Sequence, residues 1–372
     1  MANITYLLGA GASANCLPTY LNFFQRFEKF KTIFCDTNPP ENLSESQKKD
    51  YTNIKYIVVK IADEFKFHTT PDTIAKKHYH SSPGSDLQDL KRILILFFLF
   101  EQTQDITSSP EIPPGDFKFK QPIDKRYDSF IAALLKPRKG EVQFYNQFKV
   151  LTWNYDLQFE IAFSRYKQAY VSACQRSIQS IPTLFPDGSE EFNLDKFSIV
   201  HLNGIAYGKA DSFRGNTDLI GSFSNNQSQL IEYLTDVYHS ICTHGLNQQV
   251  GGDKYLTFAW EKENEEGFIV NDKILDSAYK IAEQTQVLVI IGYSFPIFNS
   301  SIDKLIFTKM NQLRKVYIQS PNGEEIKAII ADDLLNHPKL KRDNIINTNY
   351  WSQFHIPIEW NRHWNKDDSN FM

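Results

Sequence analysis

Cysteine is scarce in this sequence, with four residues among 372. They stand at positions 16, 35, 174 and 242, and no two of them form a Cys-x-x-Cys pair or another spacing typical of metal ligands. This scarcity argues against a zinc ribbon and against a small disulfide-stabilised fold, and it indicates a reducing compartment. We therefore expect a cytoplasmic protein without a bound metal.

Long apolar runs and an excess of one charge are also missing. The longest run, Ile93 to Phe100, has eight residues, whereas about 20 are needed to cross a bilayer. The N-terminal residues lack the basic and apolar segments of a signal peptide. A net charge of −4 provides no basic excess for binding nucleic-acid phosphates. We expect neither a membrane protein nor direct binding of nucleic acid.

Short apolar strands that alternate with amphipathic helices are present, and the hydrophobic content of 41% is enough for a globular core. This alternation is typical of an open, doubly wound, Rossmann-like parallel α/β sheet. The strands are expected at residues 3–9, 148–152, 197–202, 287–291 and 316–319. The helices are expected at residues 18–34, 54–68, 85–103, 125–136, 157–166, 225–246, 273–285 and 299–313.

The region between the first two strands shows no strand-like alternation. Its residues 103–122 are rich in Pro, Ser and Thr and are expected to form an exposed loop. We therefore predict a sheet domain at 1–35 and 148–325, a helical insertion at 36–147, and a C-terminal extension at 326–372. Within the first helix, we expect Leu21, Phe24, Phe27, Phe30 and Phe34 to face the core. His78 and His80 are expected to be a solvated surface pair.

A glycine-rich loop follows the first strand. It reads Gly9-Ala-Gly11-Ala-Ser13, and Ala14 completes a G-x-G-x-x-A pattern. The glycines permit a sharp turn from strand to helix and allow backbone N–H groups to approach a pyrophosphate. The acidic ribose ligand expected about 20 residues further on is missing, so the pattern does not indicate an ordinary dehydrogenase.

Polar or titratable residues follow each of the other strands. The segments that contain them are Asn154 with Asp156, His201, Gly292 to Phe295, and Ser320 to Asn322. In an open α/β sheet, ligands bind outside the carboxyl ends of the strands. We therefore expect all five strand ends to contribute to one site. The alternative is that Asn154 and Asp156 simply cap the helix that follows them.

The ordered set GAGAS, TWNYD, HLNG and IGYSF resembles sirtuin-like domains, and most closely those of bacterial anti-phage defence proteins that hydrolyse NAD. The resemblance covers about residues 1–35 and 148–325, and it implies NAD as the substrate without a metal. It implies that Asn154, His201 and Asp156 are catalytic. The residues implied to bind the nucleotide are Gly9, Ala10, Gly11, Ala12, Ser13, Thr152, Gly292, Tyr293 and Ser294. We add Asn322, which follows the fifth strand.

Two departures from the deacylating sirtuins favour NAD hydrolysis. These sirtuins carry a four-cysteine zinc ribbon, whereas only Cys242 lies in the corresponding region of this chain. They also carry an acidic and arginine-containing segment after the first glycines, where this chain reads Asn15-Cys-Leu-Pro-Thr19. Both absences weaken the case for lysine deacylation.

The chemistry expected at this site is cleavage of the nicotinamide–ribose bond through an oxocarbenium-like transition state. Asn154 would hold a water molecule or a ribose hydroxyl, and His201 would accept a proton. Asp156 would orient the loop or bind the nicotinamide amide. The products would be nicotinamide and ADP-ribose.

The resemblance also implies a biological setting, which is abortive anti-phage defence through NAD depletion. Such an activity must be held inactive until needed, so we expect a homo-oligomer and an activating partner such as a HerA-type ATPase or an Argonaute-like protein. The sequence has no phosphate-binding loop of the G-x-x-x-x-G-K-[ST] type, so an ATPase would be a separate subunit. Three alternatives stay open: a module that senses NAD or ADP-ribose, a deacylase without zinc, and a scaffold with a vestigial nucleotide site.

Overall fold

The computed structural model describes most of the chain. The described residues are 2–68, 70–81, 84–102, 123–136, 142–168, 171–181, 192–206, 227–244, 256–262, 273–334 and 339–360. The loop predicted at 103–122 lies outside them. No helix in these ranges is both long and apolar enough to span a bilayer.

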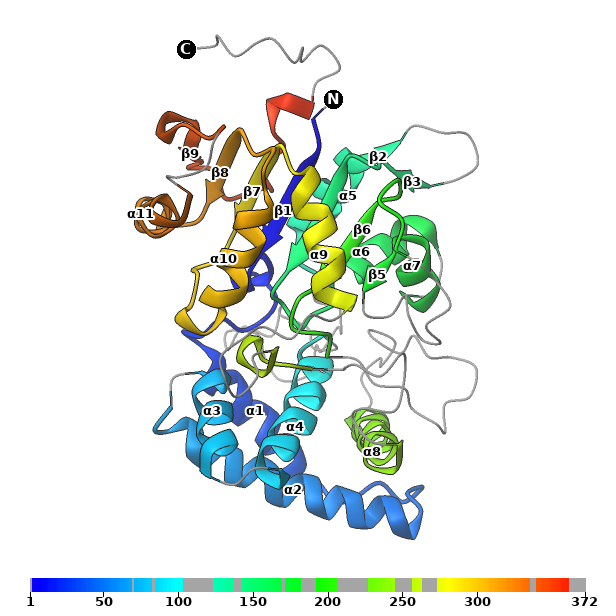
Figure 1. Ribbon diagram of the computed structural model, residues 1–372. Coiled ribbons are helices and arrows are strands. Elements are labelled where there is room, and N and C mark those ends of the chain that lie inside the picture. The colour runs from blue at the N-terminus through cyan, green and yellow to red at the C-terminus, as the bar shows by residue number, and fades with distance from the viewer. Residues whose placement is uncertain are drawn as a thin grey trace.

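A parallel sheet of seven strands forms the centre of the protein (Figure 1). Its strands are β1 (Ile4–Leu8), β4 (Phe148–Thr152), β5 (Ser180–Ile181), β6 (Ser198–His201), β7 (Val287–Ile291), β8 (Lys315–Gln319) and β9 (Ile345–Asn347). Their order is β5-β6-β4-β1-β7-β8-β9, and each pair is parallel. The chain adds β4, β5 and β6 on one side of β1 and then β7, β8 and β9 on the other, which confirms the Rossmann-like α/β sheet.

Eleven helices accompany the sheet in the described residues. They are α1 (Phe23–Cys35), α2 (Glu45–Phe65), α3 (Pro71–Ser81), α4 (Ser85–Glu101), α5 (Lys125–Leu134), α6 (Gln158–Lys167), α7 (Val171–Ser177), α8 (Gln227–His244), α9 (Lys273–Gln284), α10 (Ser300–Lys309) and α11 (Gly323–Leu334). The short strands β2 (Leu135–Lys136) and β3 (Gln143–Phe144) pair with each other outside the main sheet.

Both faces of the sheet are covered by helices. In β1, Tyr6 belongs to a core that α5 and α6 share, and Leu7 belongs to a second core formed with α9, α10 and α11. Figure 1 shows α9 and α10 in front of the sheet. Because successive side chains of a strand point to opposite faces, a sheet buried on both sides requires the continuous apolar runs seen in the sequence.

The helices α1 to α4 and α8 gather beyond the edge at which β1 ends (Figure 1). A cluster of aromatic rings joins α1 to α4, with the Phe27 and Phe97 centroids 5.3 Å apart and those of Phe30 and Phe100 also 5.3 Å apart. The predicted apolar stripe of the first helix was wrong at two positions, since Leu21 is 76% exposed and Phe24 is 38% exposed. The helix begins only at Phe23, which takes the core position instead.

Several elements differ from the predicted ones. The helix α2 begins nine residues earlier than expected, at a capping box in which Ser44 and Gln47 bind each other's backbone N–H groups. His78 is buried in α3, with Nε2 3.1 Å from Oε1 of Glu64, so the prediction of a solvated pair was wrong for this residue.

The layers of the sheet also include residues outside the sheet domain that we predicted. The helix α5 packs on β1, where the rings of Phe130 and Tyr6 are 4.6 Å apart. The strand β9 extends the sheet beyond residue 325. Helix and strand positions alone do not divide the chain into domains, so the proposed division stays a prediction.

Candidate functional site

The carboxyl ends of five strands are level with one another. Leu8 of β1 pairs with Thr152 on one side and Ile291 on the other, and Thr152 in turn pairs with His201. Ile291 pairs with Gln319 at the end of β8. The segments singled out in the sequence therefore all begin at the same edge, which faces the helices α1 to α4 (Figure 1).

The loops after β1 and β7 are in direct backbone contact. The N–H of Gly9 donates to the carbonyl of Ile291 over 3.0 Å, and that of Gly11 donates to the carbonyl of Gly292 over 2.9 Å. A Cβ on Gly11 would lie 2.7 Å from the Cα of Gly292, so only glycine fits there. The glycines thus allow the two loops to touch, and the N–H groups of Gly9 and Gly11 are bonded to the last residue of β7 and to the residue after it.

Asn154 links the loop after β4 to the glycine loop. Its side-chain Nδ2 donates to the carbonyl of Gly9 over 3.0 Å, and its backbone N–H donates to the hydroxyl of Thr152. Asn154 is buried. These bonds fix the amide beside β1 and leave its Oδ1 to accept a hydrogen bond.

His201 is buried beside Asn154 at the end of β6, with 1% of its surface exposed. Its Nδ1 lies 3.3 Å from the backbone carbonyl oxygen of Asn154, and its Nε2 lies 2.8 Å from Oε1 of Glu160 on α6. Burial lowers the pKa of His201, but the charge and hydrogen bond of Glu160 and the carbonyl of Asn154 outweigh it, so the pKa is raised overall.

Asp156 is buried at the start of α6. Its Oδ1 accepts a hydrogen bond from the N–H of Gln158 over 3.0 Å, as an Asx turn does. Burial raises the pKa of this carboxyl to about 6, although bonds from Gln158 and the Ser13 hydroxyl oppose the shift. Asp156 therefore binds the first N–H of α6 from the position before the N-cap residue Leu157, and its carboxyl also reaches the glycine loop at Ser13.

The buried side chain of Tyr293 anchors the loop after β7 to the protein interior. Its hydroxyl donates to Oδ2 of Asp303 over 2.6 Å and accepts from Nδ2 of Asn299 over 3.0 Å. Its ring stacks on Trp153, whose Nε1 donates to Oδ1 of the same aspartate. The side chain of Tyr293 is thus a buried support, whereas Ser294 lies exposed in the same loop.

The outer part of the edge is more open. Ala10 in the glycine loop is exposed, and so is Asn322 after β8. Ala12 and Ser13 are buried, and the Ser13 hydroxyl shares a hydrogen bond of 3.2 Å with that of Tyr127 on α5. The predicted residues therefore meet at one edge but divide into a buried network and an exposed rim.

Arg126, at the start of α5, binds the backbone of the glycine loop. Its Nη2 donates to the carbonyls of Gly11 and Ala12 over 3.1 and 3.0 Å, and its Nε donates to the buried carboxylate of Asp124. Asp124 also accepts from the side-chain amide of Asn15. The sequence reasoning missed Arg126 because it lies 115 residues from Gly11 and in the predicted insertion.

Asp72 lies in the first turn of α3, one of the helices beyond the sheet edge at which β1 ends. Burial raises the pKa of this carboxyl to about 6. The Asp72 charge helps to raise the pKa values of Tyr155 and Tyr293, although their own burial is the larger cause. These tyrosines follow β4 and β7, the two neighbours of β1, so the Asp72 charge acts on the loops on both sides of β1. Pro71 followed by the acidic Asp72 is the sequence signal of this helix start.

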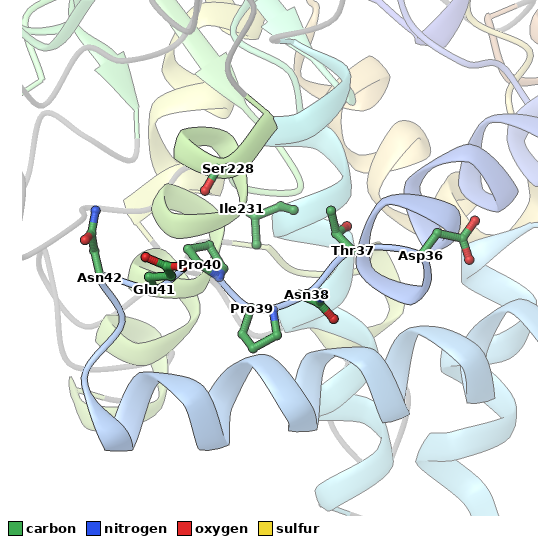
Figure 2. Close-up of a pocket in the computed structure, with 9 residues that line it drawn as sticks. All are labelled: Asp36, Thr37, Asn38, Pro39, Pro40, Glu41, Asn42, Ser228 and Ile231. Atoms are coloured by element: carbon green, nitrogen blue, oxygen red, sulfur yellow. The ribbon is translucent and has the colours of Figure 1, made fainter.

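A cavity of about 590 Å³ lies elsewhere, between the loop that follows α1 and the helix α8 (Figure 2). Pro39, Pro40 and Glu41 line it on the loop, and Ser228 and Ile231 line it on α8. It contains none of the predicted site residues.

No protein-family model matches this chain, and no curated protein matches it either. Within the described ranges, no group of three or more His, Cys, Asp or Glu side chains is arranged to hold a metal ion. All four cysteines fall in these ranges, and none is in a disulfide. The site must therefore be judged on its own residues, which are an amide, an imidazole and carboxyl groups around a glycine loop.

Proposed function

We propose that this protein is an NAD glycohydrolase that cleaves NAD to nicotinamide and ADP-ribose. One observation carries the proposal: Asn154 and His201 meet where β4 and β6 end, and Asn154 is bonded to the glycine loop of β1, which borders the switch point of a doubly wound sheet. Open α/β sheets bind nucleotides at this position. The sirtuin-like set of loops supplies the choice of NAD and of hydrolysis.

The proposed reaction needs little from the protein beyond orientation and a proton acceptor. The C1′–N bond breaks with its electron pair going to nicotinamide, which leaves neutral, and a water oxygen bonds to C1′. The water proton passes to His201 and then to solvent. Asn154 can accept a hydrogen bond from that water or from a ribose hydroxyl through Oδ1, because Nδ2 is already bonded to Gly9.

The nucleotide-binding part of the proposal relies on the exposed rim. Since the N–H groups of Gly9 and Gly11 are bonded to the end of β7 and to the residue after it, the pyrophosphate would lie against other parts of the loop, beginning with the exposed Ala10. Ser294 and Asn322 would contact the nucleotide from the neighbouring strand ends. Asp72 would approach from the helical side.

A second candidate is a module that binds NAD or ADP-ribose without turnover. The state of His201 favours it, because the ring is 1% exposed and both ring nitrogens lie against protein oxygens. A hydrolase with this site must move Asn154 or His201 before a water molecule can reach the ring. Such a requirement also fits an enzyme that is switched on by assembly.

The biological setting is proposed from the resemblance alone. It is a cytoplasmic role in abortive anti-phage defence, with homo-oligomerisation and activation by a partner such as a HerA-type ATPase or an Argonaute-like protein. NAD is the substrate, and no metal takes part in the proposed reaction.

The decisive experiment incubates the purified chain with NAD and identifies the products by chromatography and mass spectrometry. We expect nicotinamide and ADP-ribose in equal amounts, and losses of about 10²-fold or more in Asn154→Ala and His201→Ala. The control is Ser228→Ala, which alters the distant cavity. Wild-type turnover in both site variants would contradict the assignment.

The other outcomes separate the alternatives. Saturable NAD binding without turnover would identify a sensing module. Release of nicotinamide only in the presence of an acyl-lysine peptide would identify a deacylase. If NAD neither binds nor raises the melting temperature, the site is vestigial.

A further inference from the structure

Glu160 is a fully buried carboxylate behind His201. It lies in the first turn of α6, four residues after Asp156, which precedes the helix. None of its surface is exposed. Its Oε1 accepts a hydrogen bond of 2.7 Å from the Ser180 hydroxyl and lies 2.8 Å from Nε2 of His201.

A buried carboxylate needs a compensating charge or several hydrogen bonds. Oε2 of Glu160 is buried and has no hydrogen-bond partner within the described part of the chain. The two groups at Oε1 are a neutral hydroxyl and an imidazole, so the imidazole is the neighbour that can supply a positive charge. Among the two groups bonded to Oε1, His201 is therefore the one that can offset the cost of burying the Glu160 carboxylate.

The two nitrogens of His201 are in unequal positions. Nε2 faces a carboxylate at 2.8 Å, and Nδ1 faces the backbone carbonyl of Asn154 at 3.3 Å. Both oxygens are acceptors, so the protonated ring satisfies both contacts. When the ring loses one proton, the shorter bond to the charged group keeps its proton, and the lone pair is left on Nδ1.

We propose that Glu160 is the positioning residue of this site: by binding Nε2 of His201, it fixes the ring and makes Nδ1 the nitrogen that takes up and releases the proton. The role of that proton in catalysis rests on the proposed NAD hydrolysis. Glu160 itself does not touch the substrate. Among the described residues, the other charged group that acts on His201 is Asp156.

The proposed reaction determines which protonation state of His201 is active. His201 must begin neutral, with its proton on Nε2, so that Nδ1 can take the water proton as the C1′–O bond forms and the C1′–N bond breaks. Nicotinamide leaves with the bonding electron pair, and the imidazolium then returns its proton to solvent. Because Glu160 favours the imidazolium, the rate should rise with pH through the ionisation of His201.

The first test follows His201 directly and needs no substrate. Protein labelled with ¹³C at the histidine Cε1 atoms is titrated by NMR, and the His201 signal is assigned by its loss in His201→Asn. We expect a pKa above 6.5 in the wild type and a value at least one unit lower in Glu160→Gln. A wild-type value at or below 6.5 would overturn the proposal, even if Glu160→Gln does not fold.

The second test measures NAD turnover against pH. In Glu160→Gln we expect the acid limb of the profile to move to lower pH by the same amount. We also expect kcat to fall at least tenfold on the plateau, with KM unchanged within about twofold. The matched control is Ser180→Ala, which removes the other hydrogen bond to Oε1 but keeps the charge. Its acid limb should not move.

The two readings separate this proposal from the function on which it rests. If Glu160→Gln moves neither the NMR titration nor the acid limb, Glu160 is a packing residue only. If the titration moves but no variant hydrolyses NAD, Glu160 still positions His201, and NAD hydrolysis is the part that fails.

Discussion

Gly292 lies against Gly11 so closely that a Cβ on Gly292 would be 2.3 Å from the Gly11 carbonyl carbon. Gly292 also has a φ of +59°, in the left-handed region that favours glycine. Two independent requirements therefore coincide at one residue. The contact joins the loops that follow β1 and β7.

We expect Gly292→Ala to lower the free energy of unfolding by at least about 2 kcal/mol, because it combines a backbone clash with a left-handed conformation. Urea unfolding followed by circular dichroism measures this loss. The control is Gly323→Ala, where the new Cβ would meet only the side chain of Asn347 at 3.0 Å. Equal losses in the two variants would show that the loop contact is not restrictive.

Asp156→Asn should change the dependence of stability on pH. The pKa of Asp156 is raised to about 6 in the folded protein, so its stabilising contribution is complete below the ordinary value near 4 and is lost as pH rises through 6. The amide variant cannot ionise, and its melting temperature should exceed that of the wild type at pH 8 but not at pH 4.

The control for that comparison is Asp63→Asn on the exposed surface of α2. The hydrogen bond from Lys66 lowers the pKa of Asp63, so any effect of this variant should have the opposite sign. A melting temperature of Asp156→Asn below that of the wild type at both pH values would contradict this prediction. It would mean that the stability lost with the carboxylate's hydrogen bond in the Asx turn exceeds the stability gained by removing a buried charge.

Arg126→Lys should weaken NAD binding while leaving kcat nearly unchanged. A lysine keeps the charge beside Asp124 but cannot bond the two carbonyls of Gly11 and Ala12 in the same way as the guanidinium. The glycine loop is then held less firmly, and we expect KM to rise about tenfold. The matched control is Arg342→Lys on the exposed surface. An unchanged KM with a lower kcat would instead place Arg126 in the chemical step.

Asp72→Asn should make the protein more stable and less active. Burial raises the pKa of Asp72 to about 6, so the carboxylate is unfavourable at pH 8 and its amide is not. We expect a higher melting temperature at pH 8 and NAD turnover about tenfold lower. A gain in stability together with a loss of activity is typical when a charged residue serves function at the expense of stability. Glu325→Gln, on the exposed side of α11, should change neither quantity.

The central strands could be predicted well from the sequence, for a physical reason. The strand β7 is buried on both faces, so its apolar run begins and ends where the strand does, at residues 287–291. The strand β4 is equally buried, and its apolar residues Phe148, Val150 and Leu151 were enough to predict it at 148–152. The strands β5 and β9 have only two and three residues. Runs of that length show no periodicity, and pairing with their neighbours is what makes them strands.

The site could be predicted at the level of strand ends but not of contacts. Asn154 and His201 were expected to meet because parallel strands end at a common edge. Glu160 and Arg126 were missed because their roles depend on where α6 and α5 pack, and local spacing carries no information on that. The sequence also suggested that the glycines make room for a ligand, whereas Gly11 makes room for Gly292.

The bonds from Gly9 and Gly11 to the end of β7 have a consequence for the motions of the protein. In the sheet, β4 and β6 lie on one side of β1, and β7 and β8 lie on the other. The bonds therefore connect the half of the sheet that contains β1, β4 and β6 to the half that contains β7 and β8. An amide proton exchanges with water only when its bond opens. The exchange rate of the Gly11 amide proton therefore measures how often the hydrogen bond between the two halves of the sheet opens at these loops.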